Sequence, residues 1–136
     1  SNLEQTIYKA GWLGHPSTQW VMASAYNYIW LYKHMMALNE EYKLRYNHTK
    51  DHLCIQKLGE VLSTPPTNAP INVMGTDATP AMPDECKVPG DSVASYRKYY
   101  IMKKNRFATW KNKLPPQWYS EGCIKYLGGS VANANV

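Results

Sequence analysis

The sequence predicts an all-α protein, a compact bundle of three or more helices with a long proline-rich loop between the second and third main helices. Two segments, 17–46 and 92–114, place apolar side chains at three- and four-residue steps, which is the spacing of one face of an α-helix. Six of the nine prolines lie between residues 63 and 90, where they disfavour a continuous helix. We expect a single helical domain over residues 1–127 and a flexible tail over 128–136.

The first main helix is predicted from residues 17–46, which contain neither Gly nor Pro. Pro16 suits the first turn of a helix, where its missing N–H costs nothing. At 1.5 Å per residue, one continuous helix over this segment would be about 45 Å long, unless a kink divides it. Trp20, Leu31 and Leu38 lie on a common stripe of this helix, which we expect to pack on the rest of the protein.

Polar side chains interrupt that apolar stripe. A polar group on a buried face is costly unless it is paired, so the pattern predicts either a buried polar network or the wall of a pocket. A network would pair Glu41 with Arg45 four residues later. A pocket would make His34 and Glu41 candidates for acid–base catalysis, as in a small-molecule or nucleotide enzyme, and no other catalytic residue is indicated. The candidate network or pocket residues are His15, Asn27, His34, Glu41 and Arg45.

Thr49 or Asp51 is expected to cap a second helix that runs to Leu62. The proline-rich loop follows it. Loops of this length in a compact domain are often functional or packed against the domain as a clasp. Residues 82–86 within the loop are expected to form one helical turn, with Pro83 at its start.

The third main helix is expected to begin after Asp91, whose carboxylate can cap it and favours the positive end of the helix dipole. Pro115 and Pro116 are expected to end it. One face of this helix is apolar and mostly aromatic, and we expect it to face the core. Its residues are Val93, Tyr96, Tyr100, Phe107 and Trp110.

Positive charge is concentrated in the same segment. Between residues 92 and 120 there are seven Lys/Arg and no Asp or Glu, whereas the rest of the chain holds eight basic and ten acidic residues. A basic helix face with two aromatic residues just beyond its end is typical of a phosphate-binding surface, although it is also what an ordinary solvated helix face looks like. The candidate nucleic-acid-binding residues are Arg97, Lys98, Lys103, Lys104, Arg106, Lys111, Lys113, Trp118 and Tyr119.

The three cysteines form no CxxC pair and predict no disulfide framework, which favours a reducing, cytoplasmic compartment. His48 and His52 are four residues apart with Cys54 nearby, but no further ligand stands at a recognisable spacing. We therefore expect no metal and no cofactor. No apolar run approaches the roughly 20 residues of a membrane span, so a membrane partner is not expected.

Residues spread from about Gly14 to Tyr119 carry a resemblance to a known family. They are His15-Pro16, Trp20, Asn27, Trp30-Leu31, His34, Leu38, Glu41-Tyr42, Arg45, Met82-Pro83, Tyr96-Arg97, Tyr99-Tyr100, Lys103, Trp110, Pro116 and Trp118-Tyr119. With these residues the chain resembles phage-encoded proteins distantly related to the pyrimidine-dimer DNA glycosylase called endonuclease V.

The resemblance implies an all-helical protein of the host-cell cytoplasm that grips DNA, bends it and flips a nucleotide out of the stack, with Trp118 and Tyr119 near the damaged site. It also implies a Schiff base between an N-terminal amine and the sugar, assisted by a glutamate on a first helix. We expect that N-terminal catalytic segment to be missing here, so that neither the Ser1 amine nor Glu4 takes those roles. Glycosylase or lyase activity is an expectation for a full-length protein only.

Two functions follow from the sequence. The first is a DNA-binding helical domain of a phage DNA repair or base-modification protein of the glycosylase type, with double-stranded DNA as its partner. The alternative is a helical protein–protein interaction module, such as a phage inhibitor of a host factor, because Tyr, Trp, Met and Arg are the residues that interfaces use at their centres.

Overall fold

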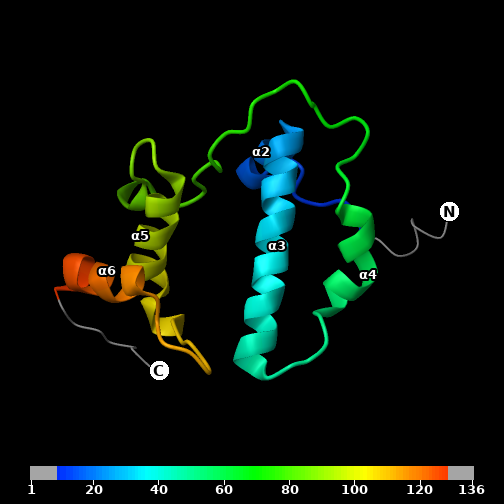
Figure 1. Cartoon of the computed structure of the whole chain (residues 1–136). Coiled ribbons are helices and arrows are strands. Elements are labelled where there is room, and N and C mark those ends of the chain that lie inside the picture. The colour runs from blue at the N-terminus through cyan, green and yellow to red at the C-terminus, as the bar shows by residue number, and fades with distance from the viewer. Residues whose placement is uncertain (1–8, 129–136) are drawn as a thin grey trace. The chain divides into compact units, whose positions relative to one another are not determined.

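The computed structural model describes residues 9–128, and the regular elements in that range are helices, apart from a single bridge residue at Thr109 (Figure 1). The all-α prediction is confirmed. Contacts within the chain divide it into two compact units, residues 1–78 (unit 1) and 79–136 (unit 2). The expectation of one domain over residues 1–127 stays a prediction, and the expected tail lies outside the described residues except for Gly128.

Unit 1 begins with α2 (Pro16–Met22) and α3 (Ala25–Tyr46), so a break divides the first predicted helix. The break lies at Ser24, whose backbone is extended, with φ −158° and ψ 142°. The Ser24 hydroxyl accepts a hydrogen bond from the N–H of Tyr26 at 3.1 Å. A serine that caps the following helix competes with a continuous helical path, which explains why the chain restarts here.

The helix α3 packs on α4 (Leu53–Leu62) through a different face from the one that the sequence predicts. Tyr28 and Tyr32 point to α4, and their hydroxyls donate to main-chain carbonyls at the C-terminal end of α4 at 2.8 and 2.9 Å. The expected packing stripe is therefore wrong beyond its first turns, because Leu31 and Leu38 are largely exposed, Leu38 by 57%. Tyrosine suits this contact because its ring packs while its hydroxyl satisfies a carbonyl.

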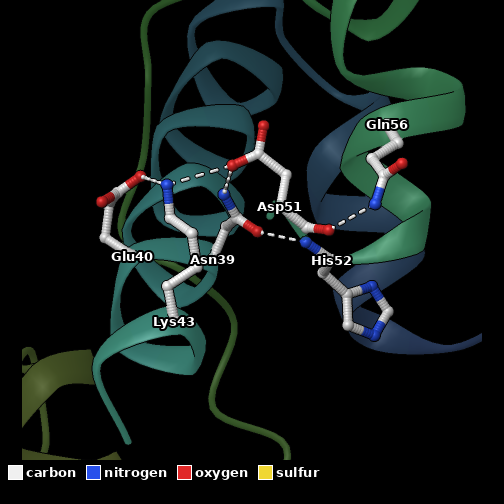
Figure 2. Close-up of polar contacts among 6 residues, drawn as sticks. All are labelled: Asn39, Glu40, Lys43, Asp51, His52 and Gln56. Carbon is white, nitrogen blue, oxygen red and sulfur yellow. Dashed lines mark hydrogen bonds and ion pairs between the residues drawn. The ribbon is translucent and has the colours of Figure 1, made fainter. Parts of the chain in front are cut away.

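A polar network fastens the turn between α3 and α4 (Figure 2). The buried side chain of Asn39 donates to the Asp51 carboxylate at 2.8 Å and accepts from the main-chain N–H of His52 at 2.8 Å. Lys43 lies 3.1 Å from the same carboxylate. The Asn39 amide and the Lys43 ammonium together lower the pKa of Asp51. The Asp51 carboxylate therefore stabilises the turn through its contacts with Asn39 and Lys43 of α3.

The residue that caps α4 also differs from the prediction. His52 is the cap, not Thr49 or Asp51, and its Nδ1 accepts from the N–H of Cys54 at 3.2 Å. The expected cap at Asp51 is wrong because its carboxylate is engaged by Asn39 instead.

Residues 70–76 of the proline-rich loop, which we call the clasp, pack against the helices α2 and α3 of unit 1. The Ser24 hydroxyl donates to the carbonyl of Val73 at 2.9 Å. The Asn27 side chain accepts from the N–H of Thr76 at 2.9 Å, and the Trp20 indole N–H donates to the Thr76 carbonyl at 3.1 Å. The loop therefore closes over the break between α2 and α3, where helix ends leave main-chain groups in need of partners.

Unit 2 contains η1 (Asp84–Cys86), α5 (Ser92–Lys104), η2 (Asn105–Phe107) and α6 (Gln117–Leu127). The predicted single turn after Pro83 and the predicted cap at Asp91 are confirmed, since the Asp91 carboxylate accepts from the N–H of Ala94 at 2.9 Å. However, α5 ends at Lys104, well before the prolines, and the sequence reasoning missed α6.

The core of unit 2 lies between α5 and α6. It contains Ile101, Ala108, Trp110, Tyr119 and Cys123. The expected apolar face of the third helix is wrong at two of its members, because Val93 and Phe107 are exposed by 54% and 61%. The chain leaves the helical path after Lys104, so helical spacing no longer decides where Phe107 and Trp110 point.

The two helices of this core approach each other closely at Gly122. A Cβ at this position would lie 2.1 Å from Cδ1 of Ile101, which is buried. The Ile101 side chain would have to move to admit any side chain at this position, so Gly122 allows the close approach of α5 and α6.

Candidate nucleic-acid interface

The net charge of the whole chain lies in unit 2. Residues 79–128 contain nine Lys/Arg and four Asp/Glu, whereas residues 1–78 contain six of each and residues 129–136 contain none. The formal charge of +5 is therefore a property of the segment around α5 and α6 alone. A local charge of this kind attracts polyanions to one part of a molecule.

The basic residues of α5 point in more than one direction. Arg97 and Lys98 flank the groove that α5 forms with α6. Lys103 forms an ion pair with Glu85 of η1, and this contact lowers the pKa of Glu85. Lys104 lies over the ring of Tyr99, 5.6 Å from its centroid. The expected single cationic face is therefore wrong, because one of its lysines is tied to an acidic neighbour.

Three further basic candidates lie beyond the end of α5. The Arg106 guanidinium sits 4.6 Å from the ring centroid of Phe107 in η2. Lys111 and Lys113 are exposed in the irregular segment that leads to α6, on either side of Asn112, whose φ is 60°. The sequence places these three on a helix, whereas the structure places them on a 3₁₀ turn and a loop.

The two aromatic candidates have different environments. Tyr119 is 1% exposed, and its ring packs 4.5 Å from that of Trp110. Burial, followed by a hydrogen bond with Cys123, raises the pKa of Tyr119 to about 12. Trp118 is partly exposed and carries the Arg97 guanidinium 5.3 Å from its ring centroid. The expectation that both rings lie on the surface is wrong for Tyr119, because adjacent residues of α6 point about 100° apart.

A groove of about 380 Å³ lies between α5 and α6. Its basic side chains are Arg97, Lys98 and Lys125, and its aromatic side chains are Trp118 and Tyr126.

Two carboxylates also line this groove, and both have polar contacts already. Asp91 caps α5 through the N–H of Ala94, and Glu121 accepts from the side-chain amide of Gln117 at 2.6 Å. The groove therefore combines three basic and two aromatic side chains from two helices with two carboxylates.

Sequence reasoning missed Lys125 and Tyr126 because it placed no helix after Pro116. A signal for that helix is present in the sequence. Apolar or small residues recur as the pairs 118/119, 122/123 and 126/127, which is a four-residue step just beyond a helix-starting proline. The Gly and Ser residues in the same segment obscured that pattern.

The predicted polar residues at the start of unit 1 have structural roles. His15 caps α2, its Nδ1 accepting from the N–H of Ser17 at 3.0 Å. Asn27 is buried and donates to the carbonyl of Trp20 at 2.8 Å, besides its bond with Thr76.

The remaining polar candidates lie further along α3 and are exposed or partly exposed. The ring of His34 stacks on that of Trp30, with centroids 5.1 Å apart and an interplanar angle of 13°. Arg45 Nε donates to the Glu41 carboxylate at 2.8 Å. Since seven residues of helix rise by about 10.5 Å, His34 and Glu41 stand too far apart along α3 to share one proton-transfer step directly.

Within residues 9–128, no group of three or more His, Cys, Asp or Glu side chains is arranged to hold a metal ion. The imidazole of His48 stacks on the ring of Tyr42 at 5.0 Å, and His52 caps α4. The three cysteines form no disulfide. Over the same described range, no helix has the length and apolar character that a bilayer crossing requires.

Comparison with known proteins identifies no relative: no protein-family model, no curated protein and no solved structure matches this chain. The resemblance to glycosylase-related phage proteins therefore rests on the sequence motifs alone.

Proposed function

We propose that unit 2 is a DNA-binding helical module whose partner is double-stranded DNA. The observation that carries this proposal is the charge distribution, with nine basic and four acidic residues in 79–128 against an equal balance in 1–78. Duplex DNA carries about one negative charge per 1.7 Å of its axis, and basic side chains that neutralise phosphates release the counterions condensed there. Affinity of this kind needs no particular base sequence.

The basic residues outside the groove suit such a contact. Lys104 and Arg106 lie on the faces of neighbouring rings, which hold their charged ends in place without an acidic partner among the described residues. Phosphates can then bind these charges with little loss of side-chain entropy. Lys103 is less available because Glu85 neutralises it.

The resemblance extends this proposal to a biological setting. In that setting unit 2 is the DNA-gripping part of a phage repair or base-modification protein of the glycosylase type, working in the host cytoplasm, where base flipping accompanies binding. No residue of the described chain is assigned a catalytic role, and glycosylase or lyase chemistry is proposed only for a full-length protein.

The proposal is tested by titrating a fluorescent duplex with the protein over a series of salt concentrations. Each phosphate that a basic side chain neutralises contributes about −0.9 to the slope of log Kobs against log salt. We expect Lys104→Gln/Arg106→Gln to make that slope shallower by about 0.9 for each phosphate that the variant no longer neutralises. Lys33→Gln/Lys57→Gln is the matched control, because it removes the same charge from exposed positions of unit 1.

Two results would contradict the proposal. One is a slope near zero for the wild-type protein, since binding to phosphates then contributes nothing. The other is an equal reduction of the slope in the variant of unit 2 and in the control, because general attraction to a basic protein would explain it.

A helical protein–protein interaction module is the second candidate, and a different observation supports it. One stripe of α3 exposes Trp30, Leu31 and Leu38 at helical spacing. Exposed aromatic and aliphatic side chains in one patch are typical of binding surfaces. Protein binding that does not respond to salt, with no affinity for DNA at low salt, would favour this function over the first.

A further inference from the structure

We infer that the groove between α5 and α6 binds a nucleoside phosphate, with the base against the rings of Trp118 and Tyr126 and the phosphate between Lys98 and Lys125. This site goes beyond the proposed duplex binding, because a paired and stacked base does not offer its face to a protein groove. The nucleotide can come from free solution or from the end of a strand.

The first argument concerns the size of the groove. The groove has a volume of about 380 Å³, which lies within the roughly 300–1,000 Å³ of small-molecule sites. Its walls are α5 and α6, which approach each other closely where Gly122 meets Ile101. The groove is present in the structure without a ligand.

The second argument concerns charge. The ammonium of Lys98 on α5 and that of Lys125 on α6 lie 5.4 and 5.2 Å from the same ring centroid, that of Tyr126. A phosphate bound beside this ring would be attracted by both ammonium groups.

The two acids of the groove keep their negative charge, since their hydrogen bonds come from neutral donors, the N–H of Ala94 for Asp91 and the Gln117 amide for Glu121. Three basic side chains line the groove against these two acids, so its formal charge is positive. Lys98 also helps to lower the pKa of Glu85, but that carboxylate forms its ion pair with Lys103.

The third argument concerns the rings. Arg97 lies over Trp118, 5.3 Å from its ring centroid, so an indole and a guanidinium stand together at one side of the groove. Nucleobases stack on both kinds of surface, and one stacked base typically gains about tenfold or more in affinity. Rings alone would bind many aromatic compounds and lysines alone many anions, so a ligand that uses both must be aromatic and anionic.

The test is isothermal titration of the wild-type protein with five probes. They are adenosine 5′-monophosphate, adenosine, inorganic phosphate, a short single strand with a 5′-phosphate and the same strand without it. We expect the monophosphate to bind at least about tenfold more tightly than adenosine or phosphate. A 5′-phosphorylated strand that binds more tightly than both the monophosphate and the unphosphorylated strand identifies a strand end as the source.

Matched variants separate this site from duplex binding. We expect Lys98→Gln/Lys125→Gln to lose the preference for the monophosphate over adenosine, and Trp118→Leu to lose the preference over phosphate. Lys104→Gln/Arg106→Gln should keep both preferences while its duplex affinity falls. Circular dichroism checks that each variant is folded, and the double lysine variant changes surface groups only.

Equal affinities for the monophosphate, adenosine and phosphate would overturn the inference, and so would an unchanged preference in Lys98→Gln/Lys125→Gln. Either result could occur with the salt dependence of duplex binding intact, in which case the proposed function stands without the groove. Loss of duplex binding alone would leave the nucleotide site in place.

Discussion

Replacing Asn27 with alanine should destabilise unit 1, because this buried side chain joins the α2–α3 break to the clasp. Its amide donates to the Trp20 carbonyl at 2.8 Å and to the Thr76 hydroxyl at 3.3 Å, and its oxygen accepts from the Thr76 N–H at 2.9 Å. Net hydrogen bonds contribute about 0.5–1.5 kcal/mol each. In the variant, the Trp20 carbonyl still accepts a hydrogen bond from the N–H of Ala23 at 3.2 Å, so this carbonyl is not left unpaired. We expect a loss of about 2–3 kcal/mol in the free energy of unfolding.

Native-state hydrogen exchange measures this loss locally. The N–H of Thr76 is expected to exchange roughly 30- to 150-fold faster in Asn27→Ala, which is the same free energy expressed as a rate ratio. The N–H of Ala25, which donates to the Pro70 carbonyl at 2.9 Å, should follow it. Asn72→Ala is the matched control, because it removes the same side chain from an exposed position of the clasp.

The reasoning would be refuted by a change below about 0.5 kcal/mol, the size of an ordinary surface substitution. It would also be refuted if residues 92–127 lost as much protection as residues 70–76. Asn27 would then affect the whole chain, and not the clasp that its hydrogen bonds define.

Three other expectations concern both units. The lowered pKa of Asp51 means that its contribution to stability is present above the ordinary value of 3.8 and is lost as the pH falls through the lower folded pKa. Acid unfolding of unit 1, followed by circular dichroism, should therefore depend less on pH below about 4 in Asp51→Asn. The pKa of Tyr119 is raised to about 12, so its contribution is present below the ordinary value of 10.0 and is lost between the two. An ultraviolet titration should show a phenol that ionises near pH 12, and that step should be missing in Tyr119→Phe. Gly122→Ala should cost about 1–3 kcal/mol in urea unfolding of unit 2 because its Cβ meets the buried Ile101, whereas Ser120→Ala on the exposed side of α6 should cost little. Equal stability of these two alanine variants would show that the helices separate without cost.

Much of the fold follows from local chemistry that a sequence displays. Asp91, Pro16 and Pro83 mark helix starts because each acts within one turn, through a side-chain oxygen or a fixed φ. The early end of α5 at Lys104 could not be read this way. No Gly or Pro marks it, and the burial of Trp110 in the core of unit 2 depends on contacts with distant segments that the local sequence does not display.

The candidate site was predictable in composition but not in geometry. Counting charges locates the basic segment without any structure. Which lysine meets an acid depends on contacts between distant segments, as when Glu85 of η1 pairs with Lys103. Tyr119 shows the same limit. Its neighbour Trp118 is partly exposed, whereas the position of Tyr119 on α6 directs its ring into the core.

Helical spacing likewise identified an apolar stripe on α3, but it did not show whether another helix would pack on that stripe. Tyrosines at neighbouring positions packed on α4 instead, because their hydroxyls could reach its terminal carbonyls. A pattern of apolar residues therefore predicts that a helix forms more securely than it predicts which side is buried.

The clasp has a consequence for digestion by proteases. A protease must draw several residues of its substrate into an extended strand before it can cut. Within residues 70–76, the Val73 carbonyl accepts from Ser24, the Thr76 N–H donates to Asn27, and the Thr76 carbonyl accepts from the Trp20 indole. Cleavage there therefore requires the junction of α2 and α3 to open first. Surface exposure alone would single out Met74 as a point of attack, yet Val73 before it and Thr76 two residues after it are hydrogen-bonded to Ser24, Asn27 and Trp20. The first cuts in this loop should therefore fall before Pro70 or after Thr76.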